Sequence, residues 1–195
     1  MIRILNLLIF FCTAAAFLSC CRKDGRWDWK NGGKALCFFT VLSNLFSGLA
    51  ALLVALTLRG DRLPYAVWML KYVATASVTV TLLTVLIFLG PTMGYKNLFQ
   101  GRDLYLHLFG PLLAVITFCF LERVYPLRFP AALWGASPVL LYGLFYLYKV
   151  VLSPEGKRWE DFYGYNKNGK WPVSFAAMML GGVLVCLLLA GLSRV

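Results

Sequence analysis

The sequence predicts an all-α, polytopic integral membrane protein, a single domain over residues 1–195 built as a six-transmembrane-helix bundle. Two observations predict this fold class. Hydrophobic residues make up 61% of the chain and charged residues only 14%, and the mean hydropathy is +0.74, a balance unlike that of soluble domains. The chain also contains six apolar runs, each near the roughly 20 residues that a membrane-spanning helix needs.

The predicted helices cover residues 4–21, 35–58, 66–89, 104–121, 131–152 and 172–192. These runs are too long for barrel strands and lack strict alternation, and a helix satisfies its own backbone hydrogen bonds in lipid. Glycine, proline and charged residues separate the runs. The six tryptophans fall near run ends, as expected of aromatic belts at the membrane interface.

The first run has some features of a secretory signal, because Arg3 precedes an apolar core and small residues precede Cys20. It is, however, as long as a full span, and five more spans follow it. We therefore expect it to be retained as the first helix. All six cysteines lie in or beside apolar runs without metal-ligand spacing, which is typical of packing residues.

The net charge of +11 is explained by membrane topology without a nucleic-acid partner. The first, third and fifth loops, here called the odd loops, hold 12 of the lysines and arginines, and the other face holds 7. The positive-inside rule then predicts cytoplasmic odd loops and external termini, although Arg3, as a signal-anchor charge, favours the opposite orientation. The expected location is the bacterial cytoplasmic membrane.

Polar residues form a stripe in the predicted second helix. Thr40, Ser43, Asn44 and Ser47 follow the i, i+3, i+4, i+7 spacing of one helix face, which in lipid must face protein or a cavity. The only histidine, His107, lies three residues into the predicted fourth helix. Both helices begin at the odd-loop face, so Thr40 and His107 are predicted to lie about one turn below the same membrane surface.

A second group of polar residues is predicted at the same face. In the fifth helix Tyr142, Tyr146 and Lys149 repeat at i, i+4, i+7, and the long fifth loop adds Asp161. We interpret Ser43, Asn44, Tyr146, Lys149 and Asp161 as candidate substrate-binding residues, because this is the one end of the bundle that is rich in polar side chains.

Two interpretations of these residues remain open. A threonine hydroxyl needs a base to become a nucleophile, and imidazole suits that task near neutral pH, so Thr40 and His107 are candidate catalytic residues. Serine, threonine and asparagine on one stripe are equally common as hydrogen-bonding contacts between helices. A lone histidine excludes a multi-histidine metal centre, and no metal or cofactor is expected. The sequence shows no charged path for a transporter.

Four segments carry a resemblance: "KALCFFTVLSNLFSGLAALLVAL", "LYLHLFGPLLAVITFCFLE", "SPVLLYGLFYL" and "FYGYNKNGKWP". They resemble the androgen-induced protein family of six-helix membrane threonine hydrolases, above all its bacterial members, which have a similar F-T-x-x-S-N in the second helix and H-x-x-x-P in the fourth. The resemblance covers most of the chain from Lys34 onward. It implies a lipid or acyl-ester substrate, notably fatty acid esters of hydroxy fatty acids, with Thr40 as nucleophile and His107 as its partner.

The expected function is therefore the hydrolysis of lipid-type esters within the membrane. The alternative is a non-enzymatic lipid-binding or interaction protein in which the stripe around Thr40 only packs helices.

Overall fold

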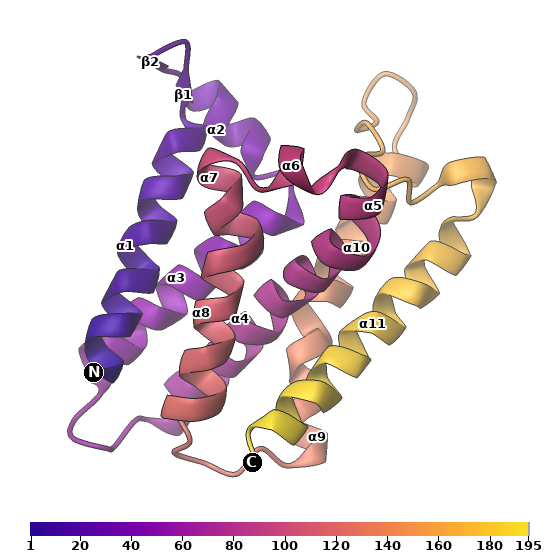
Figure 1. Cartoon of the computed structure of the whole chain (residues 1–195). Helices are drawn as coiled ribbons and strands as arrows, with labels where there is room; N and C mark the ends of the chain where they lie inside the picture. Colours follow the sequence, from indigo (N-terminus) through magenta and orange to yellow (C-terminus); the bar gives the residue numbers. More distant parts are fainter. Residues whose placement is uncertain (195) are drawn as a thin grey trace.

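Six helical segments of membrane-spanning length and composition run through the structure, a computed structural model that describes residues 1–194 (Figure 1). The spans are α1 (Ile2–Cys20), α3 (Phe39–Thr57), Tyr65–Met93, Gly101–Leu121, Phe129–Leu152 and α11 (Trp171–Leu192). The predicted all-α, multi-pass membrane fold is confirmed. The termini lie at one end of the bundle, and the odd loops lie at the other.

Three of the spans are built from several helical pieces. The third span joins α4 (Tyr65–Leu83), a π-helical segment (Thr84–Leu89) and α5 (Gly90–Met93). The fourth span joins α7 (Gly101–Leu104), a π segment (Tyr105–Phe109), α8 (Gly110–Ile116) and a second π segment (Thr117–Leu121). The fifth span joins α9 (Phe129–Ala132), a 3₁₀ turn (Leu133–Ala136), α10 (Ser137–Leu147) and a π segment (Tyr148–Leu152). The short α6 (Tyr95–Leu98) lies in the third loop.

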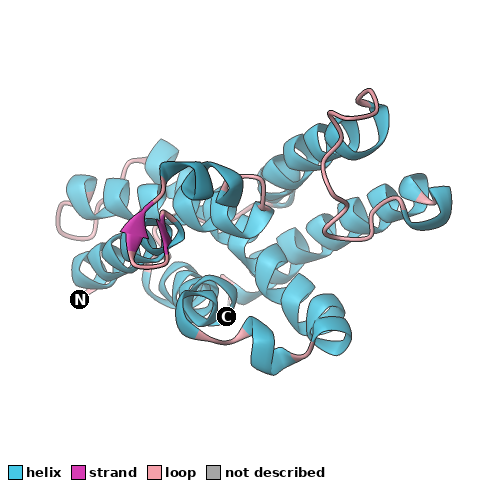
Figure 2. Cartoon of the chain, turned by 90° about the horizontal axis from the view of Figure 1, so that it is seen from above, coloured by secondary structure: helices cyan, strands magenta, loops and turns pink. Residues whose placement is uncertain are grey.

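The prediction of one helix over residues 35–58 is wrong at its start. A hairpin of β1 (Arg22–Lys23) and β2 (Arg26–Trp27) and the separate helix α2 (Trp29–Ala35) precede α3. Within residues 1–194 this hairpin is the only pair of strands, and Figure 2 shows it in magenta. Because α3 begins at Phe39, Thr40 is the second residue of its helix. The fourth span begins at Gly101, three residues earlier than predicted, so His107 is its seventh residue.

The helix α4 occupies the centre of the bundle. It packs against α3, α8, α11 and the 3₁₀ turn of the fifth span, while α3 also packs against α1. The alanines, serines and threonines between Ala74 and Thr81 of α4 are buried and allow these close approaches. Several hydroxyls return to the helix's own backbone, as Thr79 does to the Thr75 carbonyl at 2.8 Å. The serines and threonines of this helix therefore support packing.

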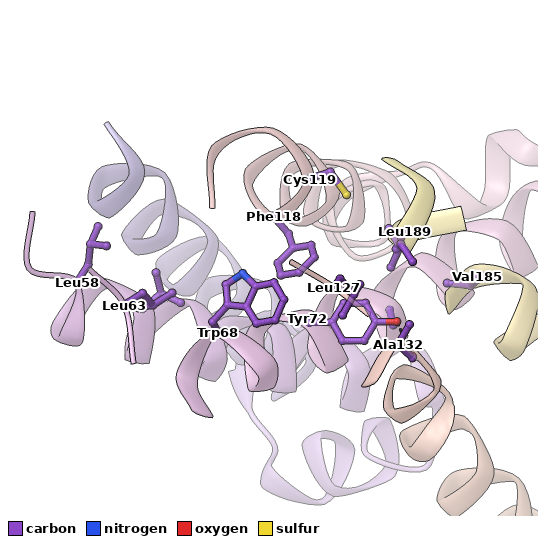
Figure 3. Packing of buried hydrophobic residues seen from close by; sticks show 13 residues of the cluster. Leu58, Leu63, Trp68, Tyr72, Phe118, Cys119, Leu127, Ala132, Val185 and Leu189 are labelled. Atoms are coloured by element: carbon purple, nitrogen blue, oxygen red, sulfur yellow. Dashed lines mark hydrogen bonds between the residues drawn. The ribbon is translucent and has the colours of Figure 1, made fainter. Parts of the chain in front are cut away.

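A cluster of buried hydrophobic residues packs around the aromatic side chains of Trp68, Tyr72 and Phe118 (Figure 3). Trp68 and Phe118 pack with ring centroids 5.5 Å apart, and the Tyr72 hydroxyl donates to the Ala132 carbonyl at 2.6 Å. Trp68 is only 1% exposed, and its indole N–H donates to the Glu122 carbonyl at 2.9 Å. Its predicted place in an interfacial belt is therefore wrong, because its polar group has an internal partner.

Candidate functional site

The side chain of Asn44 joins the second and fourth spans. Its Nδ2 donates to the Thr40 carbonyl at 2.8 Å and to the Leu106 carbonyl at 2.9 Å. Both carbonyl oxygens lie within 2.9 Å of one nitrogen, so the turn of α3 that carries Thr40 lies against the turn that carries His107. The structure thus brings the backbones of the two candidate catalytic residues together.

The local sequence of the fourth span allows this approach. Pro111 has no backbone N–H to donate. The residue before it, Gly110, donates its N–H to the carbonyl of Tyr105, five residues earlier in the chain, which is the hydrogen-bond pattern of a π-helix. A Cβ on Gly110 would lie 2.9 Å from Asn44 Oδ1. The "GP" pair therefore widens the helix at His107 and leaves space for the asparagine beside it.

His107 has one ring nitrogen held by the backbone of the third loop. Its Nδ1 lies 2.8 Å from the carbonyl oxygen of Leu98, the last residue of α6. A carbonyl can only accept a hydrogen bond, so Nδ1 carries the hydrogen and Nε2 of the neutral ring keeps its lone pair. The hydrogen bond to Leu98 therefore sets the tautomer of the half-buried imidazole and holds its ring in one orientation.

Thr40 is half-buried in the first turn of α3, beneath the fifth loop (residues 153–170). The backbone N–H of Phe39 donates to the hydroxyl oxygen of Tyr163 at 3.2 Å. This N–H belongs to the first turn of α3, where backbone donors have no partner within the helix. Burial raises the pKa of Tyr163, and the Phe39 N–H opposes this shift. Tyr163 therefore stays a neutral phenol at physiological pH, next to the candidate nucleophile.

Two predicted substrate-binding residues already have their polar groups occupied within the bundle. Ser43 is buried, and its hydroxyl lies 2.9 Å from Thr81 Oγ1 and bonds the Thr40 carbonyl at 3.1 Å. Asn44 is 1% exposed and uses both N–H groups on backbone carbonyls. An amide with no free N–H cannot donate to an oxyanion, so these two side chains hold the helices in this structure.

The other three predicted substrate-binding residues lie together in a second cluster. Tyr146 Oη lies 3.2 Å from Asp161 Oδ1, and the Asp161 carboxylate also accepts the N–H groups of Tyr165 and Asn166 at 2.8 Å. Lys149 Nζ lies over aromatic rings of the same cluster. Asp161 therefore organises the loop backbone, and the Lys149 Nζ atom lies over the rings of Phe145, Tyr148 and Trp159.

Aromatic side chains connect this second cluster to the start of α3. The rings of Phe38 and Phe162 have centroids 4.6 Å apart, and the Tyr142 hydroxyl donates to the Cys37 carbonyl at 2.7 Å. The fifth loop thus covers the helix end that carries Thr40. Two surface hollows lie away from Thr40 and His107. One is lined by Pro130, Leu133, Trp134, Ala136, Ser137, Leu140 and Met179, and the other by Lys23, Asp24, Arg26, Trp27 and Asp28.

Sequence reasoning missed a buried polar cluster at the opposite end of the bundle. Lys71 Nζ donates to Asn6 Oδ1 at 2.8 Å, and Asn6 Nδ2 donates to Glu122 Oε1 at 2.6 Å. All three residues are at most 1% exposed, and Glu122 Oε2 has no hydrogen-bond partner among residues 1–194. Lys71 lies within the predicted helix 66–89 and counts among the charges of the even-loop face, and Glu122 directly follows the predicted helix 104–121. A lysine at the seventh position of α4 is the sequence signal for a buried polar cluster here.

The fold and this site define a multi-pass helical membrane protein with a polar Thr–Asn–His region at its odd-loop end. No protein family model, curated protein or solved structure matches the chain.

Proposed function

We propose that the protein is an integral membrane hydrolase of lipid-type esters, with Thr40 as nucleophile and His107 as general base. The observation that carries the proposal is the double donation of Asn44, which sets the turns of these two residues against each other. The free Nε2 lone pair of His107, implied by the Leu98 hydrogen bond, supports it further. The resemblance to the androgen-induced family supports the same two residues.

The reaction follows the general course of acyl transfer to a hydroxyl. Thr40 Oγ1 attacks the ester carbonyl while His107 Nε2 accepts its proton, and the protonated imidazole then gives that proton to the departing alcohol. Water, deprotonated by the same nitrogen, next attacks the acyl-threonine carbonyl. The bond to Thr40 Oγ1 breaks, the fatty acid is released, and the imidazole returns its proton to Oγ1. Thr40 lies at the start of a spanning helix, where an acyl chain from the bilayer and water from outside meet.

The substrate class is an ester of a long-chain acyl group, with fatty acid esters of hydroxy fatty acids as the first to test. No cofactor or metal is required by this course. The proposed location is a bacterial cytoplasmic membrane.

The test compares purified wild type with Thr40→Ala and His107→Ala, using a hydrolase-directed phosphonate probe and a panel of long-chain esters. Both variants should lose labelling and turnover by at least about a hundredfold, because base catalysis alone contributes that much. Thr57→Ala is the matched control, since Thr57 lies in the last turn of the same helix and its hydroxyl donates only to the carbonyl of Leu53, four residues earlier in that helix. Full activity in both folded site variants would refute the proposal.

A non-enzymatic lipid-binding or interaction protein is the second candidate. The observation that favours it is that the Ser43 hydroxyl and both N–H groups of Asn44 are used in contacts within the bundle. It predicts that Thr40→Ala and His107→Ala change thermal stability alone, and that wild type neither reacts with the probe nor turns over any ester. The same experiment therefore separates the two functions.

A further inference from the structure

The segment between α1 and α3 forms a projection at the odd-loop end (Figure 1). Asp24 and Gly25 have φ angles of +50° and +77°, as the tight turn of a two-residue hairpin requires. The N–H of Asp28 donates to the Cys21 carbonyl at 2.7 Å, and Asn31 Nδ2 donates to the Cys20 carbonyl at 2.8 Å. The hairpin and α2 are therefore fastened to the end of α1.

This projection carries an exposed positive charge that no acidic residue neutralises. Its five cations, all exposed, are Arg22, Lys23, Arg26, Lys30 and Lys34. It has only two carboxylates, and the Asp28 carboxylate already accepts the N–H groups of Lys30 and Asn31 as the cap of α2. Within residues 1–194 the only salt bridge joins Arg102 to Asp103, so the five cations are available to an external anion.

Two tryptophans stand beside these cations. Trp27 and Trp29 are 53% and 68% exposed, and their rings stack with centroids 5.7 Å apart at an interplanar angle of 13°. The Arg22 guanidinium lies 4.8 Å from the Trp27 ring centroid. Exposed indoles next to cations at the end of a spanning helix match the headgroup layer of a bilayer, where tryptophan is enriched.

We infer that this surface, formed by Arg22, Lys23, Arg26, Trp27, Trp29, Lys30 and Lys34, binds the headgroups of anionic phospholipids in the leaflet at the odd-loop face. Arginine forks pair with phosphate oxygens through two N–H groups, and lysines add charge attraction. The stacked indoles anchor the projection at headgroup depth. Zwitterionic lipids offer no net charge to this surface, so the preference is for phosphatidylglycerol-like lipids.

The experiment uses native mass spectrometry of the full-length protein in detergent. It measures the amount of phosphatidylglycerol that stays bound and compares it with the amount of phosphatidylcholine that stays bound. The variant Arg22→Gln/Lys23→Gln/Arg26→Gln removes three of the cations. The matched control, Arg59→Gln/Arg62→Gln/Arg128→Gln, removes three exposed cations from the opposite face. Thermal unfolding checks that all proteins are folded, and Lys30→Gln on α2 replaces the triple variant if that one does not fold.

Wild type should retain phosphatidylglycerol in preference to phosphatidylcholine, and high salt should weaken this preference. The Lys30→Gln variant should lose about fivefold of it, and the hairpin triple variant about a hundredfold, because each cation near anionic lipid contributes comparably and the three factors multiply. The opposite-face control should match wild type, and excess inorganic phosphate should leave the lipid bound.

Three results would each overturn the assignment. The folded hairpin variant could retain as much phosphatidylglycerol as wild type, the opposite-face control could lose as much of it as the hairpin variant, or phosphate could displace the lipid completely. None of these readouts depends on ester hydrolysis, so the outcome is independent of the proposed catalytic role of Thr40.

Discussion

At the level of single residues, Asn44 shows how one amide determines the geometry of the candidate site. Its two N–H groups bond carbonyls of two different spans, and in the low-polarity interior an unmade hydrogen bond is costly. The side chain holds the turns bearing Thr40 and His107 against each other. It therefore acts as a positioning residue for the proposed reaction.

The variant Asn44→Leu should lower the free energy of unfolding by about 2 kcal/mol, because two buried carbonyls lose a donor. Thermal or chemical unfolding in detergent measures this change. Asn97→Ala is the control, since the exposed Asn97 side chain bonds only the nearby Met93 carbonyl and its loss should have little effect. An unchanged stability of Asn44→Leu would show that these hydrogen bonds are not formed.

A second residue-level prediction concerns the buried cluster of Lys71, Asn6 and Glu122. Lys71→Met should destabilise the protein by about 3–5 kcal/mol, because the Glu122 carboxylate then stays buried without a cation. Adding Glu122→Gln should restore part of that loss, since the remaining groups are neutral. A double-mutant cycle in detergent measures the coupling, and strictly additive effects would contradict the cluster.

At the level of elements, the fourth span departs from a regular α-helix at the place where function is proposed. Its π segment, Tyr105–Phe109, contains His107 and directly precedes Gly110 and Pro111. Single π turns are frequent at functional sites because they change which side chains face a neighbour. The irregular segment is therefore part of the candidate site.

The variant Gly110→Ala should reduce stability by about 1–3 kcal/mol, because its Cβ would lie 2.9 Å from Asn44 Oδ1 and 3.1 Å from the Tyr105 carbonyl oxygen. Gly181→Ala in α11 is the control, since a Cβ there meets nothing within 4 Å. That control should be neutral or slightly stabilising. Unfolding of both variants under one condition tests the comparison, and equal stabilities would contradict the close approach.

At the level of the whole molecule, the two ends of the bundle differ in chemistry. The odd-loop end holds the charged hairpin, the candidate site and the fifth loop, and the other end holds both termini and short connections (Figure 1). The excess of lysine and arginine in the odd loops predicts that this end faces the cytoplasm.

Reporter fusions test this orientation. A periplasm-dependent reporter should be active at either terminus and inactive in the fifth loop, and a cytoplasm-dependent reporter should show the reverse. The control is an Arg3→Gln chain, which should keep the same pattern if the loop charges dominate. The opposite pattern in the unmodified chain would mean that Arg3 determines the insertion.

The sequence predicted the spans well and their internal contacts poorly. Six apolar runs suffice for the spans, because bilayer thickness and backbone hydrogen bonding leave a long apolar segment no other structure. The break before Phe39 was missed, because residues 35–38 are as apolar as the helix that follows. The burial of Trp68 was missed for a similar reason: a tryptophan near a span end fits lipid and protein equally well.

Hydropathy and helical period along the chain are enough to predict a six-span all-α membrane protein and the stripe that carries Thr40 and Asn44. The packed helices alone reveal that Asn44 joins Thr40 to the fourth span, that Leu98 orients His107, and that Lys71 reaches Glu122 through Asn6. These are hydrogen bonds between distant segments, and their partners depend on how the helices rotate and pack against one another, which periodicity along one helix does not specify.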